Sequence, residues 1–387
     1  MIPFNLPFVS GKEKKYIDEV FLLQKYSGAN NFSVRVERHL SEIFNLPNPL
    51  TTPSCTAALE LAVLSLGLGI GDEVILPSFT FVSTANAFAL RGCKLIFADI
   101  RRDTLNIDET LVEALITPAT KAIAVVHYAG VCCNMDEILK IATKHDLYII
   151  EDAAQAICST YKGKPAGSFG DLSAFSFHET KNLHCGEGGA LCIKNPTLIA
   201  RCEVIREKGT DRASFFRGEV DKYTWRDYGS SYLLNELSSA FLLAQLESAS
   251  KMLKMRLDSW NYYHSKLKPL EHNGLVRLPS IPTEVNHNGH IYHLVFNCSQ
   301  DSIDFISYME RFGVHCVSHY VPLHSSPYAS LLSSLVVTSL PVTEFIASAI
   351  VRLPLWPGIQ VHQDKIIDII YNFFEKSSVN YFKKSLV

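Results

Sequence analysis

Two residues of the sequence, Lys181 and Asp152, have the side chains needed for chemistry on a carbonyl compound. Lys181 lies in the run FSFHETKN just before the glycine-rich turn GEGGA, and Asp152 ends the apolar run LYIIED. A lysine amine becomes a good nucleophile when desolvation or a nearby charge lowers its pKa. A carboxylate can hold a heterocyclic nitrogen protonated. Each residue also has a simpler interpretation, since most lysines are exposed and an aspartate after a strand is often a helix N-cap.

Hydroxyl and aromatic residues follow other apolar runs of the same region. The segment TTPSCTAALE places Ser54, Cys55 and Thr56 at the start of a predicted helix, where free N–H groups and the helix dipole suit a phosphate. Ser176 lies near the end of the run LSAFSF, and Phe81 follows the run EVILP. A lysine, an acid, phosphate donors and a covering ring together predict a site for pyridoxal 5′-phosphate (PLP). Taken singly, each of these residues also fits an N-cap, a strand hydroxyl or ordinary core.

The elements that must position these residues alternate between strand and helix over residues 54–195. This alternation predicts an α/β fold with a mostly parallel sheet covered on both faces. Ligands of such sheets gather at the carboxyl ends of the strands, where the candidate residues stand. The predicted strands are EVILP, KLIFADI, KAIAVVH, LYIIED and LSAFSF, and the predicted helices are CTAALELAVLSL, STANAFALR, DETLVEAL and MDEILKIATKH.

The rest of the sequence predicts a smaller α/β domain. Residues 235–270 have the pattern of one long amphipathic helix that leads the chain away from the sheet. Strand-like runs follow at HIYHLVFN and VHCVSHYVPL, and helical runs at SIDFISYMERF, VTEFIASAIVRL and QDKIIDIIYNFFEK. We therefore expect a large PLP-binding domain over residues 1–250 and a small C-terminal domain over residues 251–387.

The composition argues against several classes of partner. A net charge of −3 gives no reason to expect nucleic acid or an anionic membrane surface as a partner, and no apolar run is long enough to cross a bilayer. The first residues lack the features of a signal peptide, so a cytoplasmic location is expected, with the ten scattered cysteines reduced. His127, Cys132 and Cys133 lack the spacing of a zinc site, and no metal is expected.

The motifs resemble those of the DegT/DnrJ/EryC1/StrS sugar aminotransferase family. The runs that carry the resemblance are EDAAQA, FSFHETKN, GEGGAL, PSCTAALELA and PSFTFVSTANA, and it extends over essentially the whole chain. It implies a fold-type I PLP-dependent transferase, with a sheet of the seven-stranded type and active sites at a homodimer interface. It also implies transfer of an amino group from L-glutamate to a nucleotide-linked keto sugar. The runs NIDETL, VHYAGV and VDKYTWRD are most like those of members that act at C4 of dTDP-4-keto-6-deoxyglucose.

The resemblance also implies roles for individual residues. Lys181 would form the Schiff base with PLP and then serve as the base that moves the proton. Asp152 would pair with the pyridine nitrogen, Gln155 would lie at the 3′ oxygen, and Phe81 would stack on the ring. The residues that would hold the phosphate are Ser54, Cys55, Thr56 and Ser176.

One motif departs from the family pattern. Many members have an asparagine in a G-x-N-x-R-M run that reaches the phosphate of the neighbouring subunit, and here Ser231 of GSSYLL takes its place. A hydroxyl can still donate to a phosphate, so Ser231 stays a candidate across the dimer interface.

Candidate residues for the nucleotide sugar lie in two segments. The segment REKGTDRASFFRGEVDKYTWRD carries enough cations for a diphosphate, although such a segment is more often a solvated loop. The segment HYVPLH resembles the family's sugar-side segment, and a structural role is nearly as well supported for its histidines. The candidates are Lys208, Arg212, Arg217, Lys222 and Arg226 in the first segment, and His319, Tyr320 and His324 in the second.

Two other functions remain open at this stage. The enzyme could aminate C3 or give the gluco epimer, because no motif determines the face of proton delivery. The chain could also be a catalytically silent relative, which the combination of Lys181, Asp152 and Ser176 disfavours. A related dehydratase branch has histidine in place of the Schiff-base lysine, so Lys181 argues against it.

Overall fold

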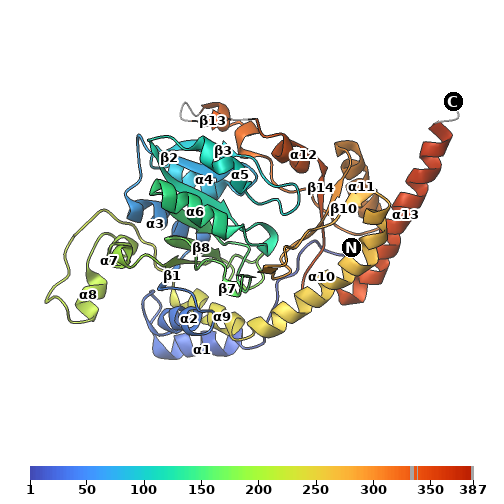
Figure 1. Ribbon diagram of the computed structural model, residues 1–387. Coiled ribbons are helices and arrows are strands. Elements are labelled where there is room, and N and C mark those ends of the chain that lie inside the picture. The colour runs from blue at the N-terminus through green and yellow to red at the C-terminus, as the bar shows by residue number, and fades with distance from the viewer. Residues whose placement is uncertain (332–334, 338, 385–387) are drawn as a thin grey trace.

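The centre of the molecule is an eight-stranded sheet (Figure 1), seen in a computed structural model that describes residues 1–331, 335–337 and 339–384. The strand order is β1-β9-β8-β5-β4-β2-β3-β13. Neighbouring strands are parallel, except that β9 runs antiparallel to both β1 and β8. The predicted α/β class with a mostly parallel sheet is confirmed. The strands are β1 Pro49–Thr52, β2 Glu73–Pro77, β3 Lys94–Ala98, β4 Thr120–Val126, β5 Tyr148–Asp152, β8 Leu172–Ser176, β9 Gly189–Ile193 and β13 Leu335–Val337.

β13 adds an eighth strand to the seven that come from residues 49–193. It pairs in parallel with β3, with Leu335 opposite Leu95 and Val337 opposite Phe97. A three-residue strand is too short for a period-two pattern to be recognised, and the family resemblance implies only a sheet of the seven-stranded type. A second C-terminal strand, β11 (Val285–Asn286), pairs with β6 (Thr160–Tyr161), which pairs with β7 (Lys164–Pro165).

The predicted division of the chain into a large and a small domain at residue 250 stays a prediction.

Residues of the central strands alternate between two hydrophobic cores. Ile75 and Ile123 pack in the core beneath α1, α2, α6 and α9, whereas Val74 and Ala122 pack in the core beneath α3, α4 and α7. Because both faces of the sheet are buried, polar side chains reach a ligand only at the strand ends. The predicted helices of this region are all present. The helices are α1 Glu13–Leu23, α2 Asn31–Glu42, α3 Cys55–Leu66, α4 Val82–Ala89, α5 Glu109–Val112, α6 Met135–His145, α7 Ile199–Arg206 and α9 Glu236–Leu246.

The single helix predicted over residues 235–270 is wrong, because the chain forms α9 and then α10 (Ala249–His272). The break falls at Glu247 and Ser248. Leu243 of α9 packs against the sheet, whereas Trp260 of α10 packs in a separate C-terminal core. The first turn of α10 still packs in the core of the sheet, through Ala249 and Met252, and the rest of the helix packs in the C-terminal core. α10 then leads from the sheet to the C-terminal part, as Figure 1 shows.

The C-terminal part, which we call the small unit (residues 249–384), has its own three-stranded sheet in the order β10-β12-β14. The predicted strand HIYHLVFN is present as β12. The predicted strand VHCVSHYVPL is wrong, since the described structure has only isolated bridges there, at Val314 and Val317. The predicted helix VTEFIASAIVRL is correct only in its first part, because its last residues form β14. The elements are β10 Val276–Arg277, β12 Tyr292–Phe296, β14 Ile350–Leu353, α11 Ser299–Arg311, α12 Pro341–Ala349 and α13 Gln360–Lys384.

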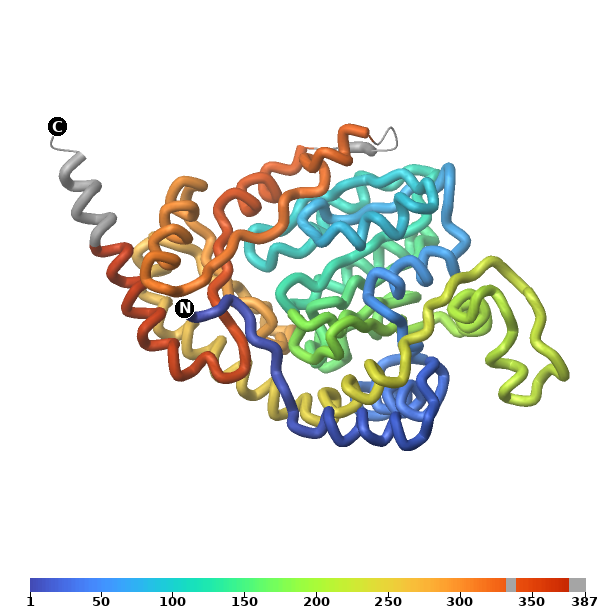
Figure 2. Tube along the Cα trace, turned by 180° about the vertical axis from the view of Figure 1, so that it is seen from behind, coloured from blue at the N-terminus to red at the C-terminus, as the bar shows by residue number. Residues whose placement is uncertain are grey.

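The N-terminal segment, residues 1–10, runs from the small unit to α1 (Figure 2). Ile2 forms a parallel bridge with Val314, and Trp356 Nε1 donates a hydrogen bond to the carbonyl oxygen of Pro3 (3.1 Å). At the other end, His184 Nε2 lies 2.8 Å from the carbonyl oxygen of Phe8. The segment therefore connects both parts of the molecule along one side.

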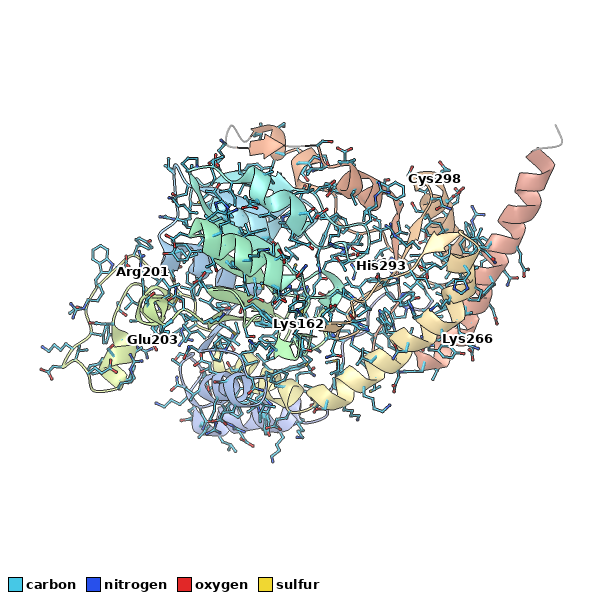
Figure 3. All side chains as sticks on the ribbon, viewed as in Figure 1. Lys162, Arg201, Glu203, Lys266, His293 and Cys298 are labelled. Atoms are coloured by element: carbon cyan, nitrogen blue, oxygen red, sulfur yellow. The ribbon has the colours of Figure 1, made fainter. Side chains whose placement is uncertain are left out.

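A projecting segment, residues 207–230, leaves the body of the molecule after α7 and contains the short helix α8 (Arg212–Phe216) (Figure 1). Two residues of α7, Arg201 and Glu203, anchor it (Figure 3). Arg201 Nε lies 3.0 Å from a carboxylate oxygen of Asp227, and Glu203 lies 2.9 Å from Arg217. These ion pairs hold the two arms of the segment to the same helix.

The ten cysteines are all free, and eight of them are buried, as expected for reduced thiols. Within residues 1–331, 335–337 and 339–384, no helix combines the length and the apolar character needed to cross a membrane.

Glu151, on β5, is fully buried and accepts four hydrogen bonds. Its Oε2 accepts from His127 Nε2 and from the N–H of Gly167, both at 2.8 Å. Its Oε1 accepts from the N–H groups of Phe169 (2.8 Å) and Gly170 (2.6 Å). The carboxylate thereby fixes the loop before β8 against β5, next to the strand end that carries Asp152.

The protonation of this pair follows from its contacts. The N–H of Cys133 donates to His127 Nδ1 (3.2 Å), so the ring proton of the neutral imidazole is on Nε2 and points at Glu151. Desolvation raises the pKa of Glu151, but the hydrogen bonds from His127, Gly170 and Gly167 outweigh it, and the pKa lies below the ordinary value of 4.5.

We predict that Glu151→Gln lowers the free energy of unfolding by about 3 kcal/mol at pH 7, because the amide would turn an NH₂ group toward backbone N–H donors. The stabilisation by Glu151 is fully present above pH 4.5 and is lost as the pH falls through the lower folded-state pKa. The difference between wild type and variant should therefore shrink in acid. Urea denaturation at several pH values measures it. Glu137→Gln on α6 is the control, with an expected change below about 0.5 kcal/mol.

Candidate active site

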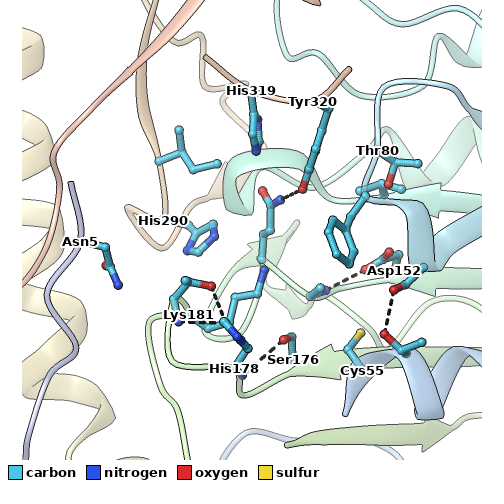
Figure 4. Close-up of a pocket in the computed structure, with 18 of the residues that line it drawn as sticks. Asn5, Cys55, Thr80, Asp152, Ser176, His178, Lys181, His290, His319 and Tyr320 are labelled. Carbon is cyan, nitrogen blue, oxygen red and sulfur yellow. Dashed lines mark hydrogen bonds between the residues drawn. The ribbon is translucent and has the colours of Figure 1, made fainter. Parts of the chain in front are cut away.

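A cavity of about 480 Å³ lies at the carboxyl edge of the sheet. Its walls come from the ends of β2, β4, β5 and β8, from the start of α3, from the N-terminal segment and from the small unit. This is the place where open parallel sheets bind their ligands. Figure 4 shows the side chains that point into it, with Lys181 and Asp152 on the sheet side and His319 and Tyr320 opposite.

Lys181 lies in the loop between β8 and β9 and lines the cavity. Its Nζ makes no hydrogen bond or ion pair with the described part of the chain. Burial lowers its pKa from 10.5, while Cys55 and Asp152 partly oppose the shift. The loop is held by Asn182, whose Nδ2 donates to the carbonyl oxygen of Asn288 (3.0 Å) and whose Oδ1 lies 2.8 Å from His290 Nδ1. The amine is thus desolvated, unpaired and fixed in position, which favours its uncharged, nucleophilic form.

Asp152 ends β5 and is 5% exposed. Its Oδ2 accepts a hydrogen bond from the hydroxyl of Thr84 (2.6 Å), and its Oδ1 accepts from the N–H of Ala154 (3.1 Å). The hydroxyl of Thr84 donates its proton to Asp152. In the 2.9 Å contact between the hydroxyls of Thr80 and Thr84, Thr80 is therefore the donor. A chain of two threonines therefore orients the carboxylate of Asp152 at the edge of the cavity.

The start of α3 provides donors for an anion. Ser54 is the N-cap, and its Oγ accepts from the N–H of Ala57 (3.1 Å). The N–H groups of Cys55 and Thr56 have no acceptor in the described structure and border the cavity. Gly189 allows this arrangement, because a methyl group there would lie 2.4 Å from the backbone carbon of Ser54. A phosphate at this helix start would meet free N–H groups and the positive end of the dipole.

The remaining predicted cofactor contacts also border the cavity, with the exception of Ser231. Ser176 is buried at the end of β8, and Phe81, at the N-cap of α4, is 56% exposed. Gln155 accepts from the N–H of Ala129 (2.7 Å), and its Nε2 donates to Tyr320 Oη (2.7 Å), which leaves one amide hydrogen free. Ser231 is exposed on the bridge to Glu207. Its predicted contact with a neighbouring subunit stays a prediction.

The two candidate sugar segments differ in position. Tyr320 and His319 line the cavity as a stacked pair, with ring centroids 3.8 Å apart. His324 lies outside the lining, and its Nδ1 is 2.7 Å from Ser78 Oγ. No cation of the projecting segment lines the cavity of its own chain. Several of them are in ion pairs: Arg212 with Glu207, Arg217 with Glu203 and Glu219, and Arg226 with Asp211. Lys208 and Lys222 are exposed. A substrate contact of these residues stays a prediction.

Several residues at the site were not among the sequence predictions. Thr84 lies within the quoted run STANAFALR, and its position one helical turn after Thr80 was the available signal. His290, Arg256 and Arg352 come from the small unit, and no local pattern distinguishes them from structural residues.

The residues fit the parts of PLP. A desolvated amine, an oriented carboxylate and free N–H groups at a helix start would meet the aldehyde, the ring nitrogen and the phosphate. Among the residues that the structure describes, no group of three histidine, cysteine or acidic side chains could hold a metal ion.

Known proteins resemble this chain over almost its whole length. The model of the DegT/DnrJ/EryC1/StrS aminotransferase family matches residues 9–371. The spore coat polysaccharide biosynthesis protein SpsC of Bacillus subtilis is 32% identical over 379 residues, 95% of either chain. GDP-perosamine synthase of Vibrio cholerae is 30% identical over 383 residues, 97% of this chain and 99% of the relative. The PLP form of Spr1654 from Streptococcus pneumoniae has a TM-score of 0.88 at 26% identity, covering 97% of this chain and 99% of that chain.

We predict that Lys181→Ala loses the visible absorption of the lysine-linked cofactor and slows transamination at least ~10³-fold, because no other amine replaces its nucleophile and base. Spectra after incubation with PLP, and single-turnover rates, measure the two effects. Lys162→Ala, which removes an exposed lysine paired with Asp136, should change neither. Full transamination by the Lys181→Ala protein would contradict the assignment.

A second prediction concerns pH. The rate at which apo protein captures PLP should rise with pH through the folded-state pKa of Lys181 and level off below pH 10.5. Because the charge of Asp152 raises this pKa, Asp152→Asn should move the midpoint to lower pH. Stopped-flow absorbance over a pH series gives both midpoints. An unchanged or higher midpoint in the variant would show that the two groups do not interact.

Proposed function

Because the chain belongs to the DegT/DnrJ/EryC1/StrS aminotransferase family, we propose that it transfers an amino group from L-glutamate to C4 of dTDP-4-keto-6-deoxyglucose. The products are dTDP-4-amino-4,6-dideoxygalactose and 2-oxoglutarate. The chain is a PLP-dependent sugar aminotransferase. The choice of substrate is supported by the motifs NIDETL, VHYAGV and VDKYTWRD, which resemble those of the enzyme that makes this sugar for enterobacterial common antigen.

The observation that carries the activity is the convergence of Lys181 and Asp152 on one cavity with the start of α3. A silent relative would have no physical reason to keep a buried, unpaired amine facing an oriented carboxylate, since both cost stability. Two relatives have names consistent with this reading: SpsC is named for polysaccharide biosynthesis and GDP-perosamine synthase for a nucleotide-linked product.

Each group has a defined task in the reaction. When bound, PLP supplies an electron sink for breaking a C–H bond next to nitrogen. Lys181 Nζ, whose pKa is lowered by burial, accepts a proton from the donor carbon and later delivers one to the sugar carbon. Asp152 holds a proton on the ring nitrogen, and the N–H groups of Cys55 and Thr56 bind the phosphate. Donor and acceptor use the same cavity in turn, so the kinetics should be ping-pong.

We further propose that the working unit is a homodimer whose projecting segments reach the neighbouring subunit. In this segment Trp225 is 82% exposed and Phe216 is 67% exposed, which is unusual for large apolar side chains. Lys208, Lys222 and Ser231 lie in or next to the segment and away from the cavity of their own chain. A dimer would allow them to act on the partner's substrate. The cytoplasmic location stays a prediction from the sequence.

The test of the substrate separates donor from acceptor. L-glutamate alone should bleach the visible band of the PLP-loaded enzyme, because the first half-reaction needs no sugar. The bleached enzyme is then offered dTDP-4-keto-6-deoxyglucose, the GDP-linked 4-keto sugar and a dTDP-linked 3-keto sugar, and the return of the band is timed. The dTDP-linked 4-keto sugar should react at least tenfold faster than the others.

Product analysis by NMR completes this test. An axial amine at C4 is expected for the galacto product. An equatorial amine, or faster return of the band with the 3-keto sugar, would replace the proposed reaction by one of its alternatives. A protein that binds PLP but never bleaches would refute the choice of L-glutamate.

A further inference from the structure

His290 is a buried histidine of the small unit whose side chain reaches the cavity. It lies two residues before β12, is 8% exposed and belongs to the cavity lining. Arg256 fixes its backbone, because Nε and Nη2 donate to the carbonyl oxygens of Gly289 (3.0 Å) and His290 (2.7 Å). The N–H of His290 donates to Asn288 Oδ1 (3.1 Å). Figure 4 shows the imidazole ring at the cavity near Lys181.

The hydrogen bonds of Asn182 determine which ring nitrogen of His290 carries the proton. Asn182 Nδ2 donates to the carbonyl oxygen of Asn288 (3.0 Å), so Asn182 Oδ1 is the acceptor in the 2.8 Å contact with His290 Nδ1. The proton of the neutral ring is therefore on Nδ1, and Nε2 carries a lone pair. No described residue donates a hydrogen bond to this Nε2.

The ring stays neutral because it is desolvated and surrounded by cations. Burial and the charges of Lys181, Arg256 and Arg352 hold the pKa of His290 well below its ordinary value of 6.5. Arg352, on β14, also lines the cavity, and its guanidinium is in no ion pair with the described residues. A proton on Nε2 would add one more positive charge to this wall. His290 therefore offers the cavity a neutral hydrogen-bond acceptor among cations.

Two other buried histidines of the chain show a different arrangement. Nδ1 of His184 and Nδ1 of His293 have no hydrogen-bond partner, but both atoms are closed off inside the protein, and neither residue lines the cavity. The free nitrogen of His290 is on a residue of the lining instead. A buried polar side chain with a free atom at a cavity points to a ligand that supplies the missing bond.

We propose that His290 Nε2 accepts a hydrogen bond from the amino group of the substrate that exchanges with Lys181. The proposal rests on the aminotransferase function. Each half-reaction brings an amino group to the place of the Lys181 amine, from L-glutamate in the first and in the sugar product at the end of the second. A charged amino group has three N–H donors and no acceptor, so it needs a lone pair such as that of Nε2.

The other groups of the ligands match Nε2 less well. The carboxylates of L-glutamate and the phosphate of PLP are acceptors themselves, so a lone pair repels them. The hydroxyl groups of the sugar are on carbons other than the reacting one, whereas the amino group must come next to Lys181. A carboxylate in the place of His290 would also bind an amino group, but it would pair with Lys181 and raise the pKa of that amine. A neutral imidazole binds an N–H group without forming an ion pair.

Two variants separate the two ring nitrogens. In His290→Asn the amide NH₂ takes the position of Nδ1 and keeps the bond to Asn182, but no acceptor replaces Nε2. In His290→Gln the longer side chain places its amide oxygen near the position of Nε2, and the bond to Asn182 is lost. The control is His272→Asn, at the exposed last residue of α10.

The experiment compares ligands that differ only in the amino group. PLP is fixed to Lys181 by borohydride reduction, so that no exchange takes place, and L-glutamate and glutarate are titrated by calorimetry. In His290→Asn the ratio of the glutarate Kd to the L-glutamate Kd should be at least about tenfold lower than in the wild type, because only L-glutamate has the amino group. His290→Gln should lose less, and His272→Asn should equal the wild type.

The same comparison separates this proposal from the proposed function. L-Alanine and propionate form a second pair of ligands, and their ratio should fall by the same factor. The result therefore holds even where L-glutamate is not the natural donor. No sugar is present, so a wrong choice of acceptor leaves it unchanged as well.

The exchange of amines gives a second readout. α-Methyl-L-glutamate can displace Lys181 from PLP but has no hydrogen on the reacting carbon, so stopped-flow absorbance records exchange without transamination. Its concentration for half-maximal exchange should rise about 30-fold in His290→Asn. Capture of PLP by the apo variant should stay within twofold of the wild-type rate, because Asn182 still holds the lysine loop. A merely structural histidine would make His290→Gln, which frees Asn182, the more damaging variant in both measurements.

Two results would overturn the proposal. A ratio of Kd values within twofold of wild type in His290→Asn would show that Nε2 does not bind the amino group. Weaker binding of dTDP-4-keto-6-deoxyglucose to this variant, with the ratio unchanged, would assign Nε2 to a hydroxyl group of the sugar.

Discussion

The chemistry of this protein depends on keeping one lysine amine out of water without giving it a partner inside the protein. Desolvation lowers the pKa of Lys181, but a neighbouring carboxylate in direct contact would reverse the effect. Lys181 makes no such contact, because the carboxylate of Asp152 is hydrogen-bonded to other groups. Both oxygens of Asp152 already accept hydrogen bonds, from Thr84 and Ala154. The acid borders the cavity without pairing with the amine, and it opposes the lowered pKa of Lys181 only in part.

The same constraint explains why the cavity needs two parts of the chain. The sheet edge supplies the lysine, the acid and the helix start, but a sheet edge alone is open to solvent. The small unit closes it through hydrogen bonds of polar side chains. The side chain of Asn182 bonds the carbonyl oxygen of Asn288 and the ring of His290, and Gln155 bonds Tyr320. These hydrogen bonds satisfy buried polar groups and at the same time position the lysine loop. Closure and positioning are thus provided by one set of interactions.

The sequence was sufficient for what depends on local pattern. The strands β2, β4, β5 and β8 are buried on both faces and read as apolar runs. Asp152 ends one of them, and Lys181 lies in the loop after another. The break at Glu247 was missed because no glycine or proline marks it, and only the change of packing partners along α10 shows where the chain turns. The Thr84 bond to Asp152 and the unpaired guanidinium of Arg352 were also missed. Each depends on residues far apart in sequence, which no local pattern encodes.

The pairing of β13 with β3 has a mechanical consequence. Through this pairing a strand of the small unit is hydrogen-bonded into the sheet of the large one, at an edge that would otherwise carry unpaired backbone groups. A wide hinge opening between the two parts would have to break this pairing or bend the chain next to it. The exchange of amino acid for nucleotide sugar should therefore occur through a mouth of nearly constant width. Turnover would then be limited by diffusion through that mouth or by proton transfer, and not by the swing of a domain.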